Sequence, residues 1–268
     1  MNTIQKFDTI HQYNEFLGQE TLHPLVNVIN LAQSCRLRHG LHSFGFYTVF
    51  LKEIKCGNLR YGCNYYDYQE GTVTSFAPGQ VVEVDMPQGV RPNAHGLLFH
   101  PDLIKGTSLG QDIKHYSFFS YASAEALHLS EEEKSIFTDC LEKIRMELQH
   151  PIDKHSKRLI SRNIELLLDY CMRFYERQFI TRSESNKSVL VKFEALLDDY
   201  FQSDKPQTDG LPSVKYFADK VFLSPNYFGD LIKKETGKSA QEYIQTRMID
   251  IAKEMIAGTE KTVSQIAY

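Results

Sequence analysis

The sequence contains no tryptophan and only five cysteines: Cys35, Cys56, Cys63, Cys140 and Cys171. Their odd number and the lack of any C-x-x-C pair argue against a disulfide framework and indicate a reducing compartment. We interpret the cysteines as small buried apolar residues, with a redox-sensing role for Cys56 and Cys63 as the alternative. Long apolar runs are also absent, and the polar N-terminal segment lacks a signal-peptide pattern, so we predict a cytoplasmic protein without a membrane partner.

The sequence motifs of common enzyme and cofactor sites are missing too. A cupin metal site needs two histidines one residue apart, and the spacings of His39 with His42 and of His95 with His100 do not supply such a pair. No G-x-S-x-G elbow, Walker loop or G-x-G-x-x-G turn occurs. We therefore expect no enzyme activity, no metal and no cofactor.

An excess of positive charge is absent as well. The whole chain has a formal net charge of −4, and residues 187–268 carry 11 Lys+Arg against 12 Asp+Glu, a net of −1. A nucleic-acid partner would therefore have to be held by locally placed cations rather than by bulk charge. The length of 268 residues and the hydrophobic content of 42% are enough for two domains with cores of their own.

Residues 213–237 carry the start and stop signals of two short helices joined by a tight turn. Ser213 can cap the first helix, and Ser224 followed by Pro225 can begin the second. Gly237 provides a left-handed stop. Apolar residues at three- and four-residue spacing give each helix an inward face: Val214, Phe217, Ala218 and Val221 in the first, and Phe228, Leu231 and Ile232 in the second.

The opposite face of the second helix carries short polar residues followed by two lysines. Asn226 is of the type that pairs bidentately with adenine, and Asp230 could accept a hydrogen bond from cytosine. Lys233 and Lys234 suit phosphates. The pattern favours a helix-turn-helix that reads DNA; an ordinary helix pair with a solvated polar face is the alternative.

A third helix and the start of a repeat follow. Ser239 can cap a helix that runs to about residue 257. After it, Val263, Ile266 and Ala267 repeat the positions of Val214, Phe217 and Ala218 with a constant offset of 49 residues. A second helix-turn-helix begins here, and the sequence stops inside it.

Residues 189–268 resemble the DNA-binding domain of the AraC/XylS family of bacterial transcription regulators. The resemblance rests on LSPNYF, on KKETGKS followed by YI, and on Arg247 with IAKEMI. It implies a recognition helix over 225–236, a linker helix over 239–257 and a second unit that is incomplete in this sequence. Arg247 would brace the two units or touch the DNA backbone, unless it is an ordinary exposed arginine. The implied DNA-binding residues are Ser224, Pro225, Asn226, Tyr227, Gly229, Asp230, Lys233, Lys234, Lys238 and Arg247.

Before residue 130 the pattern is typical of short strands. An aromatic and β-branched run covers 44–51, and further runs are expected at 60–67, 72–77, 81–85 and 94–100. This spacing predicts a small barrel or sandwich, and the family resemblance implies a cupin-like jelly-roll sensor domain over residues 1–129. Its interior could hold an effector of unknown identity. The candidate ligand-binding residues are His42, Tyr47, Arg60, Tyr61 and Tyr65, with simple half-buried strand positions as the alternative for the tyrosines.

Residues 130–180 form a predicted helical section. Ser130 with Glu133 makes a capping box for a first helix, and a second helix is expected over 154–179. The second helix carries an apolar stripe that can pack within the domain or against a second copy of the chain. We favour a homodimer, because this pair of helices often mediates dimerisation in the family that the sequence resembles. The members of this stripe are Ile160, Ile164, Leu167, Cys171 and Phe174. The polar, aperiodic segment 181–188 predicts an interdomain linker.

The expected architecture is α+β: a cupin-like β-barrel or jelly roll with a helical dimerisation section, then an all-α helix-turn-helix domain. The expected function is sequence-specific binding of promoter double-stranded DNA by a transcription regulator that responds to a small-molecule effector. The alternative is a truncated paralogue that does not bind DNA but dimerises with intact relatives and modulates them.

Overall fold

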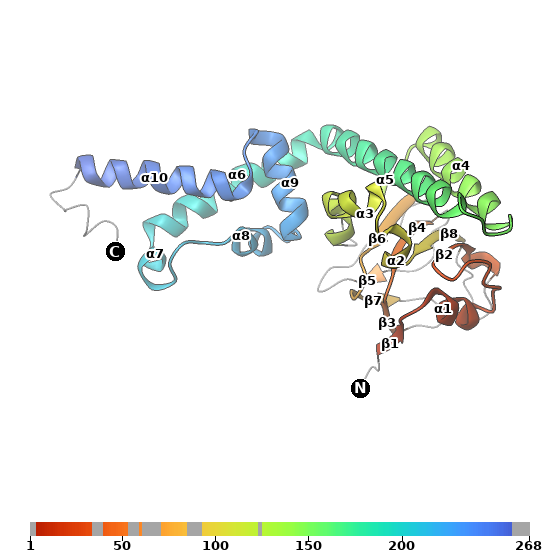
Figure 1. The fold of residues 1–268 in the computed structure, drawn as a ribbon. Coiled ribbons are helices and arrows are strands. Elements are labelled where there is room, and N and C mark those ends of the chain that lie inside the picture. Colours follow the sequence, from red (N-terminus) through yellow and green to blue (C-terminus); the bar gives the residue numbers. More distant parts are fainter. Residues whose placement is uncertain are drawn as a thin grey trace. The chain divides into compact units, whose positions relative to one another are not determined.

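The computed structural model describes residues 4–33, 40–52, 59–60, 71–84, 93–122 and 125–258. The chain divides into two compact units, Met1–Gln178 and Phe179–Tyr268 (Figure 1). The first unit combines strands with helices, and the described part of the second is entirely helical, so the expected α+β class is confirmed. No helix in the described ranges is both long enough and apolar enough to cross a bilayer.

The first unit contains two sheets rather than a closed barrel among its described residues, so the expected barrel closure is wrong. One sheet has the order β1-β3-β7-β5, and the other has the order β2-β8-β4-β6-β9. Strands β1 and β3 pair in parallel, and all other pairs are antiparallel. The strands are β1 (Ile4–Phe7), β2 (Val26–Asn30), β3 (Gly40–Phe44), β4 (Tyr47–Lys52), β5 (Leu59–Arg60), β6 (Thr72–Phe76), β7 (Val81–Val84), β8 (Ala94–Phe99) and β9 (Leu127–His128).

The run expected as one strand over 44–51 is split between the two sheets. Strand β3 ends at Phe44 and β4 begins at Tyr47. Gly45 lies between them and donates its N–H to the carbonyl of Phe7 at 2.8 Å. A Cβ at this glycine would lie 2.7 Å from the carbonyl oxygen of Asp8, so only glycine allows the backbone to pass this closely. The expected strands at 72–77, 81–85 and 94–100 are confirmed within one residue as β6, β7 and β8.

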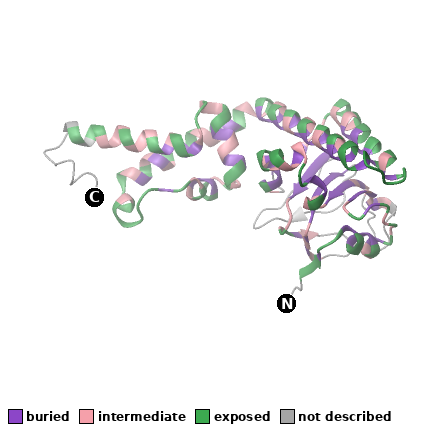
Figure 2. Ribbon diagram, viewed as in Figure 1, coloured by how far each residue is buried: buried purple, intermediate pink, exposed green. Residues whose placement is uncertain are grey.

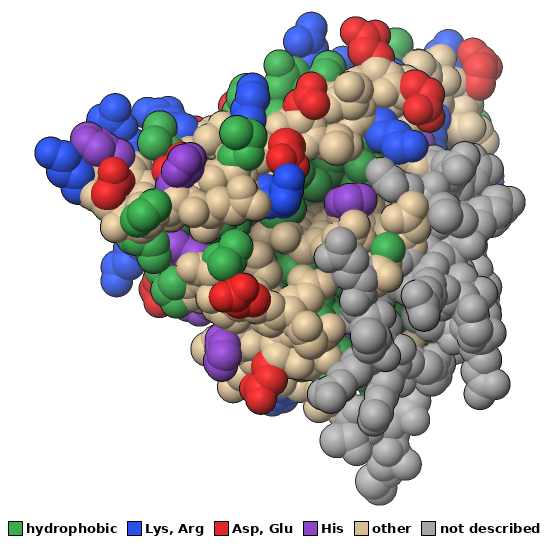
Figure 3. All heavy atoms as spheres, turned by 90° about the vertical axis from the view of Figure 1, so that its right-hand side faces the viewer, with side chains coloured by type: hydrophobic (Ala, Val, Ile, Leu, Met, Phe, Trp, Pro, Cys, Tyr) green, Lys and Arg blue, Asp and Glu red, His purple; other side chains and the backbone are tan. Residues whose placement is uncertain are grey.

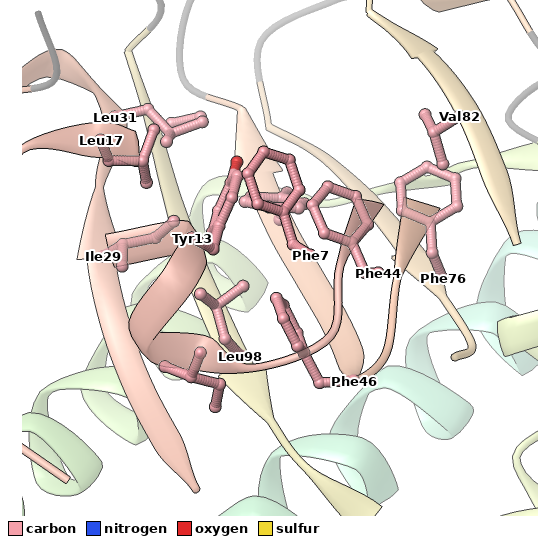
Figure 4. Packing of buried hydrophobic residues seen from close by; sticks show 13 residues of the cluster. Phe7, Tyr13, Leu17, Ile29, Leu31, Phe44, Phe46, Phe76, Val82 and Leu98 are labelled. Atoms are coloured by element: carbon pink, nitrogen blue, oxygen red, sulfur yellow. The ribbon is translucent and has the colours of Figure 1, made fainter. Parts of the chain in front are cut away.

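An aromatic core lies between the sheets. It takes residues from both sheets and from α1 (Ile10–Leu17), a helix that the sequence pattern did not predict. Figure 4 shows the rings of Phe7, Tyr13 and Phe44 gathered at its centre, with centroids 5.0 Å apart for Phe7 and Tyr13 and 5.2 Å for Tyr13 and Phe44. Strands β4, β6 and β8 are buried along almost their whole length.

Two long helices complete the first unit, α4 (Glu131–Leu148) and α5 (Ser156–Thr181). The predicted capping box is confirmed, because Ser130 accepts from the N–H of Glu133 while the Glu133 carboxylate accepts from the N–H of Ser130. Between β8 and β9 lie the short helices α2 (Pro101–Ile104) and α3 (Ser108–Asp112) and two 3-10 turns, Ile113–His115 and Ser117–Ser120. Figure 2 shows buried residues along the strands and on one side of each long helix.

The apolar stripe of α5 is buried within a single chain. Ile160, Ile164, Leu167, Cys171 and Phe174 are all at most 5% exposed. The expectation that these side chains face a second copy is therefore wrong. Their spacing of four and three residues correctly indicates that one side of α5 is buried. That side packs against other residues of the same unit. Cys140 and Cys171 are buried free thiols, as interpreted, and Cys35, Cys56 and Cys63 lie outside the described residues.

The second unit begins before the expected linker ends. Helix α5 continues to Thr181 and α6 (Ser183–Gln202) starts two residues later, so segment 181–188 is mostly helical and the linker prediction is wrong. Within this segment, buried Asn186 donates its Nδ2–H to the carbonyl of Phe179 at 2.8 Å and so ties α6 to the end of α5. The remaining helices are α7 (Lys205–Thr208), α8 (Val214–Lys220), α9 (Pro225–Thr236) and α10 (Ala240–Gly258).

Phe193 of α6 organises the core of the second unit. It is fully buried, and its ring lies 5.1 Å from that of Phe217 in α8 and 5.1 Å from that of Phe228 in α9. The ring of Tyr243 in α10 lies 5.5 Å away. One aromatic side chain thus contacts the three helices that follow it and fixes their positions relative to α6.

Candidate nucleic-acid interface

The turn between α8 and α9 is built by hydrogen bonds that the sequence largely predicts. Ser213 accepts from the N–H of Tyr216 at 3.2 Å, and Ser224 accepts from the N–H of Tyr227 at 3.3 Å, so both predicted N-caps are confirmed. Gly237 adopts the expected left-handed conformation at the end of α9, with φ of 73°.

The end of α8 has a feature that the sequence reading missed. Phe222 adopts φ of 61°, the left-handed region that usually favours glycine. Its N–H donates to the carbonyl of Asp219 at 3.3 Å, and the N–H of Leu223 donates to that of Ala218 at 3.0 Å, which is a Schellman motif. The side chain of Phe222 is 77% exposed. No glycine marks the position, so sequence alone gave no sign of it.

Helix α9 has one buried and one exposed side. Phe228, Leu231 and Ile232 are at most 1% exposed, as predicted. Tyr227, expected to bind DNA, is also buried, and its ring lies 4.9 Å from that of Phe179. That expectation is wrong: Tyr227 precedes Leu231 by four residues and therefore shares its inward face.

The exposed side of α9 contains the other predicted reading residues. Pro225, Asn226, Lys233 and Lys234 are exposed, and Ser224, Gly229 and Asp230 are half-buried. Asn226, Gly229 and Lys233 follow each other at three- and four-residue spacing, so they share one side of the helix.

Packing within the chain does not require a glycine at position 229. A Cβ added at this position would meet no atom within 4 Å. Glycine inside a helix costs about 0.5–1 kcal/mol relative to alanine. A helix that accepts this cost without needing the space internally has room for close approach by an external partner.

Cationic side chains surround the C-terminal end of α9. Lys233, Lys234 and Lys238 are exposed, and their amino groups have no ion-pair partner in the part of the chain that the structure describes. Glu242 lies near this group: the Ser239 N–H and hydroxyl, followed by the charges of Lys233 and Lys238, hold the pKa of Glu242 below its usual value. The carboxylate of Glu242 also caps the start of α10, because it accepts a hydrogen bond from the N–H of Ser239 at 2.8 Å.

Arg247 is engaged within the unit. Its Nη2 lies 2.9 Å from Oδ1 of Asp198 in α6. The guanidinium therefore braces α10 against α6, which favours a structural role over contact with a DNA backbone. The echo at Val263, Ile266 and Ala267 lies outside the described residues.

The candidate ligand-binding residues of the first unit are not brought together. His42 is 2% exposed and is packed against the rings of Phe7 and Phe16, at 5.6 Å and 5.9 Å. Tyr47 stacks on Phe99 at 4.9 Å, on the sheet face opposite to Phe50 and the aromatic core. The two residues therefore belong to different layers, and the prediction that they share a site is wrong.

The remaining candidates of that set cannot complete it. Only the backbone of Arg60 is described, and Tyr61 and Tyr65 lie outside the described residues. Within the described ranges, no three His, Cys, Asp or Glu side chains are grouped so as to hold a metal ion.

The chain matches no protein-family model, and it matches no curated protein.

Proposed function

We propose that the second unit binds double-stranded DNA with α9 as the recognition helix of a helix-turn-helix, and that the protein is a transcription regulator. The observation that carries the proposal is Gly229, an exposed-side helix glycine whose missing Cβ is not needed by any neighbour in the chain. On the same side of α9 lie Asn226 and Lys233, which are exposed. A helix that enters the major groove needs such a side, with polar groups for base edges and space for the DNA.

Each exposed residue has a role in this proposal. Asn226 reads a base edge, and Lys233, Lys234 and Lys238 bind phosphates. The near-neutral charge of residues 187–268 makes these few cations decisive, because the rest of the unit adds no electrostatic attraction. Arg247 contributes indirectly, by holding α10 on α6.

The first unit is proposed to be a cupin-like sensor that adjusts DNA binding in the cytoplasm. Its two sheets enclose an aromatic core and are fused to the helical unit, an arrangement suited to a regulatory domain. A homodimer would present two recognition helices. Exposed residues of α5, Leu159 and Leu166, could serve this purpose in place of the buried stripe.

Selection from a pool of random duplexes with the full chain tests the DNA-binding proposal. We expect an enriched motif. Asn226→Ala should relax the preference at one base pair, since a bidentate contact is worth about 1–3 kcal/mol. Lys233→Gln should weaken binding to all sequences and lower the salt dependence by about one counterion. Lys143→Gln, at an exposed position of α4, is the matched control and should change neither. Recovery of a pool no different from the input would refute the proposal.

A further inference from the structure

A second group of cations lies in the first unit, around a hollow of about 410 Å³. The hollow is formed by the start of α5 and by the connection between α2 and α3. From the connection come Thr107 and Ser108, and from the α5 side come Lys154, Arg158, Ser161 and Arg162. Figure 3 shows several Lys, Arg and His side chains close together at one edge of the face that it draws, with acidic side chains beside them.

The hollow has a surplus of positive charge. Lys157, which also lines it, donates to the carbonyl of Lys105 at 2.9 Å, and Arg162 pairs with Glu165 at 2.9 Å. Glu165 also accepts from the hydroxyl of Ser108 at 3.0 Å. Lys154 and Arg158 are exposed and have no ion-pair partner among the described residues, and Lys157 bonds only to a neutral carbonyl, so the lining keeps a net positive charge.

The acid nearest in sequence keeps its negative charge but is held by backbone groups at the start of α5. Asp153, which precedes Lys154, accepts from the N–H groups of His155 and Ser156 at 2.7 Å and 3.0 Å. Its carboxylate is therefore used to cap the start of α5. The helix dipole adds further positive potential at this end of a helix of 26 residues.

Ser161 supplies an independent sign of a ligand. Its side chain is 97% buried, since its exposed fraction is 3%, and it lines the hollow. Its hydroxyl has no hydrogen-bond partner. A buried hydroxyl without a partner is costly, and helix serines usually bond to the carbonyl four residues earlier. The hydrogen-bonding capacity of this hydroxyl is therefore unused within the described part of the chain.

We propose that this hollow binds the phosphate group of a small molecule. Arg158 and Lys154 would supply the charge, and Ser161 the buried hydrogen bond. A guanidinium fork matches the oxygens of a phosphate, and the volume is in the range of small-molecule sites rather than that of a single ion. The concave shape favours a small ligand over the backbone of a nucleic acid. This inference is independent of DNA binding by α9.

Titration calorimetry of the full chain at constant ionic strength tests the site, with inorganic phosphate and phenyl phosphate as probes and chloride as the reference. We expect saturable binding of one phosphate group per chain. Tighter binding of phenyl phosphate would identify an organic phosphate as the ligand class, and equal binding would identify free phosphate; both support the site. Arg158→Gln should weaken binding about tenfold or more, as expected for a hydrogen bond to a charged group. Ser161→Ala should weaken it severalfold while the variant stays folded.

Arg173→Gln is the matched control, because Arg173 is exposed on the same helix but does not line the hollow. It should bind both probes like the parent. Equal heats for parent and Arg158→Gln, or a response that chloride reproduces, would overturn the proposal. A loss of duplex DNA binding in Arg158→Gln without any phosphate binding by the parent would also overturn it, because the cations would then belong to a nucleic-acid surface.

Discussion

Arg247 in α10 directs both its Nε and its Nη2 at the same oxygen of Asp198 in α6, at 3.0 Å and 2.9 Å. One turn earlier, Tyr243 donates to Glu194 at 2.6 Å. Burial, and then the bond to Glu194, raise the pKa of Tyr243 to about 12. Both pairs span 49 positions, so α6 and α10 run side by side in the same direction.

We predict that Arg247 acts mainly through Asp198. Both side chains are more than a third exposed, so solvent screens the pair and its contribution is at most about 1 kcal/mol. Arg247→Gln and Asp198→Asn should each lower the free energy of unfolding by a similar small amount, and the double variant should lose little more than either single one. Urea unfolding measures this cycle. If Arg247→Gln weakened DNA binding much more than Asp198→Asn did, Arg247 would be a DNA contact instead.

Gly229→Ala should separate stability from binding. The added methyl group meets nothing in the chain, so the free energy of unfolding should rise by about 0.5–1 kcal/mol through helix propensity. The same methyl group would stand on the proposed reading side of α9, so affinity for the selected duplex should fall. Thermal unfolding and fluorescence anisotropy measure the two effects. Unchanged affinity in the stabilised variant would remove Gly229 from the interface.

Phe222→Asn should stabilise the second unit. A left-handed backbone costs most residues about 1–2 kcal/mol, whereas asparagine tolerates it. Because the Phe222 side chain is largely exposed, little apolar contact is lost on its replacement. Phe222→Ala is the control: it removes the ring but keeps the strain, so it should give no gain. Equal unfolding midpoints for the two variants would show that the strain is not relieved by asparagine.

The helices of the second unit could be predicted from sequence because their signals are local. Ser213, Ser224 and Gly237 act on backbone groups within a few residues, and the inward faces follow from helical spacing. Tyr227 was misplaced because the family resemblance implied a DNA contact that its helical spacing contradicts. The function of the exposed face stays a prediction, since it depends on a partner and not on the chain's own packing.

The first unit could be predicted less well because its order depends on distant residues. Strand β1 pairs with β3 across nearly forty positions, Ile4 with Leu41, and no local pattern encodes that pairing. The crossing at Gly45 between the sheets places His42 and Tyr47 in different layers although they are five residues apart. The apolar stripe on α5 likewise predicts that one side of the helix is buried, but it does not predict which residues pack against that side.

The exposed leucines of α5 should mediate any homodimer. Leu159 and Leu166 are 45% and 40% exposed and lie seven residues apart on one side of the helix. Burying a leucine contributes about 1.5–3 kcal/mol, so Leu159→Arg with Leu166→Arg should shift a dimer to monomer. Sedimentation equilibrium of the full chain measures this, and Lys143→Gln on α4 is the control. A parent that stays monomeric at all concentrations, or a double variant that stays dimeric, would contradict the prediction.

His42 should make the first unit sensitive to acid. Burial lowers the pKa of His42, which in the unfolded chain is about 6.5. At pH values between the lowered pKa of the folded state and about 6.5, the unfolded chain binds more protons than the folded chain. The contribution of His42 to the free energy of unfolding is therefore complete above about pH 6.5 and decreases as the pH falls through this range. One histidine contributes a slope of at most about 1.4 kcal/mol per pH unit. Burial also lowers the pKa of His23, which adds a term of the same sign.

His42→Phe tests the assignment, because the aromatic neighbours Phe7, Phe16 and Phe44 suit a phenyl ring and the unpaired Nδ1 disappears. Urea unfolding at several pH values from 7.5 downward should give a shallower loss of stability for this variant than for the parent, with the slope from His23 remaining. His150→Gln, at an exposed position, should keep the parent's profile. If His42→Phe lost stability toward acid as steeply as the parent, the protonation that destabilises the unit would have to occur elsewhere, and the buried imidazole would be no more than a packing residue.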